Sequence, residues 1–166
     1  MRKLRRKCPN FEPSGILAEE DNLVNGVVLK FNEPMDAAEP DRRWRLYVFK
    51  GEEELPTLHI HRQSCYLIGR DDRVSDILLE HPSISSQHAV IQYREYKDVD
   101  ANGSMIYEVR PYIIDLESTN KTMLNTVEIE PARYYELRDK DILNFGKSTR
   151  DYVIMTGSLL KDNEDD

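Results

Sequence analysis

The sequence predicts an all-β fold, a β-sandwich of about ten to eleven short strands, on three observations. Short apolar or alternating segments recur along the chain, with turn residues between them at a spacing of roughly 8–12 residues. β-branched and aromatic side chains dominate these segments. No segment shows the 3.6-residue period of an amphipathic helix. Because strands this short cannot bury a core singly, two sheets must share one core between them.

The expected strands follow one another along the chain. The first, residues 26–31, lies in a segment that is otherwise irregular. Residues 43–50 alternate aromatic and β-branched side chains and end at a glycine. An Asn-Gly pair at 102–103 predicts a turn between two longer strands. The remaining strands are expected at 64–68, 76–80, 88–96, 106–116, 122–125, 127–129, 133–137, 141–145 and 151–155.

Composition divides the chain into three segments. Residues 1–40 lack strong periodicity and contain several prolines, so we expect an extended segment that either packs along a folded domain or is ordered by a partner. Residues 41–157 carry the strand pattern and are expected to form one domain. Residues 158–166 end in a run of acidic side chains and are expected to be a disordered tail.

Charge and hydropathy exclude several classes of protein. The chain has 166 residues, 23 basic and 31 acidic, with a net charge of −8 and a mean hydropathy of −0.65. No apolar run approaches the roughly 18–20 residues that span a bilayer, so we expect no membrane contact. An acidic body argues against the broad basic face that non-specific nucleic-acid binding requires.

The basic residues at the start of the chain leave one question open. Residues 2–7 carry five basic side chains without an apolar stretch behind them, which excludes a secretory signal. This basic start is a solvated tail, a nuclear address or an arm that touches RNA.

The two cysteines, at positions 8 and 65, exclude a disulfide scaffold and a cysteine-rich zinc module.

Catalytic and metal-binding patterns are weak. His59 and His61 would share one face of a strand, but no third ligand follows at a suitable spacing and Arg62 would repel a dication. A surface or capping role is the better interpretation for both histidines. Ser64-Cys65 lacks a nearby candidate base, and no glycine-rich loop precedes a helix. We therefore expect no enzyme activity, no metal and no cofactor.

The polar residues that stand out lie in loops at strand ends. Arg70 ends one strand, Ser85 lies in the next long loop, and Asn120 follows a later strand. Loops of a sandwich gather at its two ends, so these three side chains can converge. A guanidinium with hydroxyl and amide donors suits a tetrahedral dianion such as a phosphate group.

The order of these motifs resembles that of the forkhead-associated (FHA) family of phosphothreonine-binding domains. The matching segments are Gly69-Arg70, Ser85-Ser-Gln-His88, Ser118-Thr-Asn-Lys-Thr122, Asn125 and Leu137-Arg-Asp-Lys-Asp-Ile-Leu-Asn-Phe-Gly146. The resemblance spans roughly residues 42–156 and implies an FHA-type sandwich that binds a phosphothreonine peptide.

The resemblance also implies a role for each matching residue. Arg70 and Ser85 would bind the phosphate oxygens, with a hydroxyl or backbone contact from Ser86. Asn120 would hold the ligand backbone and Thr119 would flank the phosphate.

Four further positions bear on this expected pocket. Gly69 and His88 would be architectural, the glycine by allowing close approach and the histidine by holding the Ser85 loop. Glu117 and Lys121 stand where the family commonly has glycine. If the turn at Lys121 requires a positive φ, lysine costs on the order of 1 kcal/mol there, although its ammonium could add a phosphate contact.

Further segments resemble one branch of the family. They are Pro9–Gly15, Arg43–Tyr47, His61–Ser64, His81–Ser83, Ser86–Arg94, Arg110–Asp115 and Ile129–Leu137. This branch holds the Smad nuclear-interacting protein, the plant protein Dawdle and the FHA subunit of the pre-mRNA retention and splicing (RES) complex.

Membership of that branch implies a nuclear phosphothreonine reader in splicing, a monomer within a larger complex. Residues 1–40 would tether it to a subunit with an RNA-recognition motif, and RNA contact would be indirect or through the basic start. Two alternatives stay open. One is a structural splicing subunit whose phosphate pocket is little used, and the other is a regulator of small-RNA processing.

Overall fold

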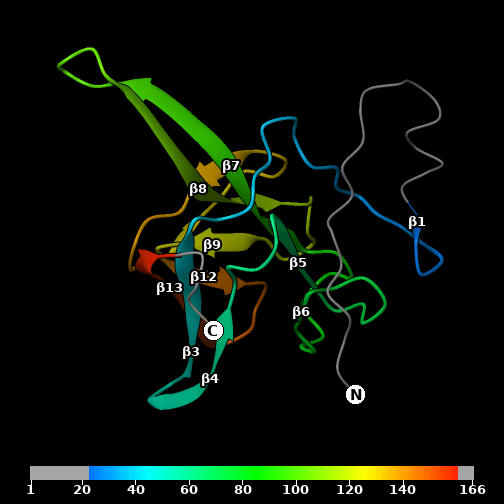
Figure 1. The fold of residues 1–166 in the computed structure, drawn as a ribbon. Coiled ribbons are helices and arrows are strands. Elements are labelled where there is room, and N and C mark those ends of the chain that lie inside the picture. The colour runs from blue at the N-terminus through cyan, green and yellow to red at the C-terminus, as the bar shows by residue number, and fades with distance from the viewer. Residues whose placement is uncertain (1–22, 161–166) are drawn as a thin grey trace.

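Two β-sheets packed face to face form the body of the molecule (Figure 1). The structure is a computed structural model that describes residues 23–160. Within these residues there are thirteen strands and no helix, so the predicted all-β sandwich is confirmed. One sheet has the order β10 (Val127–Glu128), β9 (Thr122–Leu124), β12 (Ile142–Phe145), β13 (Arg150–Leu159), β3 (Arg42–Lys50) and β4 (Glu53–His59). The other has the order β11 (Tyr134–Glu136), β8 (Met105–Asp115), β7 (Ala89–Val99), β5 (Cys65–Gly69) and β6 (Ile77–Leu78).

The main core lies between the two sheets. Alternate residues of each strand point into it, because side chains in a strand alternate between its two faces. Leu46 and Ile154 from one sheet and Ile68, Ile91 and Ile113 from the other are fully buried there. This alternation is the pattern that predicted the strands.

A second apolar cluster covers the outer face of the five-stranded sheet. Leu29 and Phe31, which follow the short hairpin of β1 (Leu23–Val24) and β2 (Val27–Val28), pack with Leu67, Val90 and Ile114. Every residue of β5 is therefore buried, since both faces of that strand are covered. The described part of the N-terminal segment thus packs along the domain, and residues 1–22 lie outside the described residues.

Two predicted elements differ from the structure. The single strand expected at 26–31 is instead a hairpin whose turn, Asn25-Gly26, has positive φ at both residues, as a two-residue hairpin turn requires. Sequence reasoning also missed β4, because its glutamates and Pro56 disfavour a strand. The strand lies at the edge of its sheet, where a proline is tolerated, and its register shifts beside Pro56.

The hairpin of β7 and β8 is the longest element. Its two strands pair without interruption from Ala89↔Asp115 to Val99↔Met105, which confirms the turn predicted at Asn102-Gly103. The far half of the hairpin projects from the sandwich (Figure 1). At the near end, the loops that follow β5, β6, β8 and β12 meet, and this end carries the predicted site residues.

Candidate functional site

Arg70 joins two loops at this end of the sandwich. Its backbone N–H donates to the carbonyl oxygens of Ser85 and Ser86, each at 3.1 Å. The approach depends on Gly69, since a Cβ atom there would lie 2.1 Å from the Ser86 oxygen. The side chain of Ser86 is exposed. The Ser86 carbonyl therefore fixes the Arg70 backbone, and the close approach of the two loops explains why glycine precedes the arginine.

The Arg70 guanidinium, from the loop after β5, lies against the loop that carries Ser85. Arg70 Nε donates to the Ile84 carbonyl at 2.8 Å, so its two terminal amino groups are left to face solvent. Ser85 Oγ accepts the backbone N–H of Thr119 at 3.1 Å, and the hydroxyl proton is left to donate. The two loops thus present a cationic fork beside a hydroxyl donor, a combination that suits an anion.

Asn120 is fixed from a third loop. Its Nδ2 donates to the Ser83 carbonyl at 2.9 Å, which uses one of the two amide hydrogens and leaves the amide oxygen. Lys121 acts through its backbone, because its carbonyl oxygen accepts from the Gly146 N–H at 2.8 Å. The structure therefore brings Arg70, Ser85, Thr119 and Asn120 together at one end of the sandwich.

His88 supports the Ser85 loop from the core. The fully buried imidazole accepts the Ser85 backbone N–H at Nδ1, at 3.1 Å. Because Nδ1 accepts, the ring hydrogen is on Nε2, which donates to the Lys121 carbonyl at 2.9 Å. Burial lowers the pKa of His88, although the Lys121 carbonyl and the Asp115 carboxylate favour the charged form. The neutral imidazole therefore connects two loops of the site.

A buried carboxylate, which sequence reasoning missed, organises the third loop. Asp115 accepts the Ser118 hydroxyl at 2.6 Å, the Ser118 N–H at 3.0 Å and the Thr122 hydroxyl at 2.7 Å. All three side chains are almost fully buried. The sequence does contain a signal for this arrangement, namely an acid at the end of an apolar strand followed by closely spaced hydroxyl residues.

Two residues of this loop adopt left-handed backbone conformations. Glu117 has φ 55° and Lys121 has φ 71°. The turn at Lys121 thus has the positive φ at which a lysine is expected to cost on the order of 1 kcal/mol of stability. The exposed Glu117 side chain follows the strand end that carries the site.

The two histidines of the His59-x-His61 pair lie in different surroundings. His59 is exposed at the end of β4, whereas His61 lies beyond the strand and is buried, so a surface role is wrong for His61. Within residues 23–160, no three His, Cys, Asp or Glu side chains are grouped closely enough to hold a metal ion. The same residues contain no helix able to span a membrane.

Comparison with known proteins identifies a matching family and several similar proteins. The family model named FHA domain matches residues 66–146. FHA domain-containing protein DDL of Arabidopsis thaliana is 55% identical over 152 residues, which cover 91% of this chain and 48% of that protein. Smad nuclear-interacting protein 1 of Mus musculus is 53% identical over 150 residues, covering 90% of this chain and 39% of that protein. The chain thus spans less than half the length of these curated relatives.

Solved structures show the same fold. The structure of the yeast Pml1 splicing factor is 30% identical with a TM-score of 0.63, and the match covers 77% of this chain and 97% of that one. The yeast Dun1 FHA domain is 25% identical with a TM-score of 0.54, covering 82% of this chain and 90% of that one.

The fold and the loop motifs define a binding module of the FHA type, and the chain belongs to the FHA family. Within that family it belongs to the branch of DDL, Smad nuclear-interacting protein 1 and Pml1.

Proposed function

We propose that the loop end of the sandwich binds a phosphothreonine-containing segment of a partner protein. The observation that carries this proposal is the placement of the free Arg70 amino groups beside the Ser85 hydroxyl. A phosphate dianion offers oxygens to both donors, and charge-assisted hydrogen bonds of this kind are strong. The related Dun1 domain was solved with a doubly phosphorylated (pT) peptide, which supports the same ligand class here.

Each remaining residue has a place in this proposal. Asn120 has one amide hydrogen and its oxygen left to hold the ligand backbone. Thr119 flanks the phosphate and is itself fixed to Ser85. Ser86 adds its exposed hydroxyl, and Lys121 adds its ammonium from the neighbouring turn.

The cellular setting that we propose is nuclear pre-mRNA processing. The yeast relative Pml1 is a splicing factor, and its structure was solved together with an account of its integration into the RES complex. By this likeness the chain is a monomeric subunit of a larger assembly, tethered through residues 1–40 to a subunit with an RNA-recognition motif. Residues 23–40 also pack on the domain, so the tether is best sought in residues 1–22.

A titration against a degenerate phosphothreonine peptide library, with the unphosphorylated library in parallel, tests the ligand. We expect micromolar binding that depends on the phosphate. Arg70→Ala should weaken it by at least about 30-fold, because one partner of a desolvated charge pair is lost. Arg73→Ala is the matched control, since Arg73 lies in the same loop but pairs with Asp71 at 2.9 Å. Equal binding by Arg70→Ala would refute the pocket.

Two further readouts separate this function from the alternatives. Phosphothreonine gains its second charge near pH 6, so affinity should rise between about pH 5 and pH 7. Deletion of residues 1–22 should disrupt assembly with the partner subunit while leaving phosphopeptide binding intact. A chain that assembles normally but ignores both libraries would be a structural subunit instead.

A further inference from the structure

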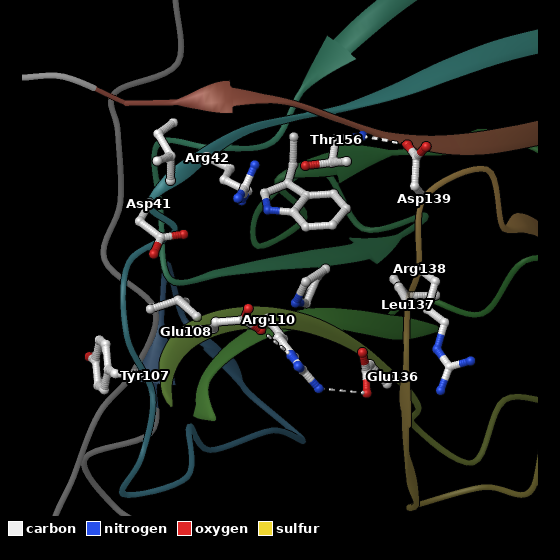
Figure 2. Close-up of a pocket in the computed structure, with 14 residues that line it drawn as sticks. Asp41, Arg42, Tyr107, Glu108, Arg110, Glu136, Leu137, Arg138, Asp139 and Thr156 are labelled. Atoms are coloured by element: carbon white, nitrogen blue, oxygen red, sulfur yellow. Dashed lines mark hydrogen bonds and ion pairs between the residues drawn. The ribbon is translucent and has the colours of Figure 1, made fainter. Parts of the chain in front are cut away.

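A groove of about 620 Å³ lies at the end of the sandwich opposite the loops that carry Arg70, Ser85 and Asn120. It is bordered by the first half of β8 and by the start of β3 and the end of β13 (Figure 2). Because β8 and β13 have their other ends at the loop site, the groove and that site are separated by the length of these strands. The groove therefore does not belong to the site already described.

The groove is lined by an unpaired strand edge. β11 pairs with β8 only from Tyr112 to Ile114, after which Leu137 N–H donates to the Pro111 carbonyl. Alternate residues of a strand direct their N–H and C=O groups to the same edge, so those of Val109 and Tyr107 also point to this edge. Within residues 23–160, no backbone group pairs with them there. An open edge of this kind is a template for an added strand.

A buried donor in the same groove lacks an acceptor. Trp44 lines the groove and is 7% exposed, and its indole Nε1 has no hydrogen-bond partner among residues 23–160. Buried polar groups in folded proteins are nearly always paired, so an orphaned N–H indicates a missing oxygen atom. An extended peptide laid along β8 would offer carbonyl oxygens.

The charged side chains around the groove nearly balance, since three arginines lie among the four carboxylates of Asp41, Glu108, Glu136 and Asp139. Arg110 is already bound to Glu108 at 2.7 Å and to Glu136 at 3.5 Å, and Asp139 accepts the Thr156 N–H at 2.9 Å.

Two guanidinium groups are left over. Arg42 and Arg138 are exposed on different sides of the groove, and neither side chain has a partner within the described residues (Figure 2). The carboxylates of Asp41 and Asp139 also have no ion pair in the described part of the chain. The Trp44 N–H is a further donor in the groove without an acceptor.

We infer that this groove binds an extended, unphosphorylated segment of a partner protein, which adds to the free edge of β8 as a further strand. Its apolar side chains face Trp44, Val109 and Leu137 at the base of the groove, where all three are buried. Acidic side chains of the segment reach Arg42 and Arg138. Main-chain bonds supply affinity and the alternating side chains supply specificity, as in other strand-addition complexes.

The test uses the tryptophan that the inference depends on. Trp44 is the single tryptophan of the chain, so its fluorescence reports binding at the groove. The probe is the blocked peptide acetyl-Glu-Val-Asp-Val-Glu-Leu-Ser-amide, titrated into the full chain. We expect a saturable change in Trp44 emission below 1 mM, whatever the outcome of the phosphopeptide titrations. The same probe with N-methyl groups at alternate residues should bind at least tenfold more weakly.

Matched variants locate the contact. Tyr107→Pro removes the free-edge N–H but no backbone bond to β7, and both it and Tyr107→Ala lose the side-chain bond to Glu95. Tyr107→Pro should therefore weaken binding by about fivefold relative to Tyr107→Ala, which keeps the N–H. Arg42→Glu with Arg138→Glu should weaken binding by about tenfold, whereas Arg133→Glu, whose arginine pairs with Glu130 outside the groove, should not.

Three outcomes would overturn the inference. They are an unchanged Trp44 emission up to 1 mM probe, equal affinity for the N-methylated probe, and binding that requires removal of residues 161–166. The last would make the acidic end of this chain the occupant.

Discussion

The side-chain amide of Gln87 accepts the backbone N–H of Lys30 at 2.9 Å, across 57 residues of sequence. The same amide donates to the Val28 carbonyl at 3.0 Å, so it pairs with the N-terminal segment as a neighbouring strand would. Gln87 is buried and stands between Ser86 and His88 in the loop that carries Ser85. The N-terminal segment therefore supports the loop that carries Ser85.

Gln87→Ala tests this support. The substitution leaves two backbone groups without their partner, so we expect a loss of about 1–3 kcal/mol in the free energy of unfolding. Phosphopeptide affinity should also fall severalfold, because the loop loses its attachment. Urea denaturation and peptide titration measure the two effects. Gln63→Ala, which removes one bond to the Cys65 carbonyl away from the loop, should change stability alone. An unchanged affinity in Gln87→Ala would show that the segment does not position the loop.

The neutral His88 imidazole predicts a pH dependence of stability. Because burial lowers the pKa of His88 in the folded chain, the unfolded chain binds a proton more readily. The stabilisation is therefore complete above about pH 6.5, the usual histidine value, and is lost as the pH falls below it. The loss cannot exceed about 1.4 kcal/mol per pH unit for one group.

Denaturation of the chain between pH 7 and pH 5 measures the effect of His88. We expect a flatter pH profile for His88→Gln than for the natural chain. Exposed His59 provides the control, and His59→Gln should retain the natural slope. If both variants kept that slope, another group would be responsible.

Much of this architecture was predictable from local sequence. The strands that border the core are recognisable by their alternation, and the site loops by Gly69-Arg70 and the hydroxyl residues that follow. β4 was missed because its stability comes from pairing with β3 at a sheet edge rather than from its own residues. The hairpin of β1 and β2 was misplaced because its sequence signal lies in the Asn25-Gly26 turn and not in its two-residue strands.

The site was less predictable than the fold. Hydrogen bonds such as that from Asn120 to the Ser83 carbonyl join residues that are far apart in sequence. Asp115 was missed because its function is to accept bonds from the loop and not to contact a ligand. No spacing rule relates Gln87 to Lys30, since their pairing follows from how the N-terminal segment lies on the sheet.

Asp115→Asn should unfold the third loop first. The carboxylate accepts three hydrogen bonds inside the protein, from the Ser118 N–H and from the hydroxyls of Ser118 and Thr122. The side-chain NH2 group of an asparagine in its place would point its own hydrogens at one of these donors. We expect a loss of about 2–4 kcal/mol in the free energy of unfolding, with weaker phosphopeptide binding. Asp98→Asn is the control, because Asp98 accepts two bonds on the exposed hairpin. Equal losses for both variants, measured by urea denaturation, would contradict a special role for the buried carboxylate.

The left-handed conformations of Glu117 and Lys121 predict that glycine improves both positions. A side chain at positive φ costs about 1–2 kcal/mol, and glycine gives back about half of this through its greater freedom in the unfolded chain. Glu117→Gly and Lys121→Gly should therefore each raise the free energy of unfolding by about 0.5–1 kcal/mol. Their effects on phosphopeptide affinity should have opposite signs, since the first removes a carboxylate beside the proposed anion site and the second removes an ammonium. Glu117→Gln separates charge from backbone strain, because it should strengthen binding at low salt without changing stability. Calorimetry at two salt concentrations gives both quantities, and a Glu117→Gln variant with unaltered affinity would place that carboxylate outside the reach of the ligand.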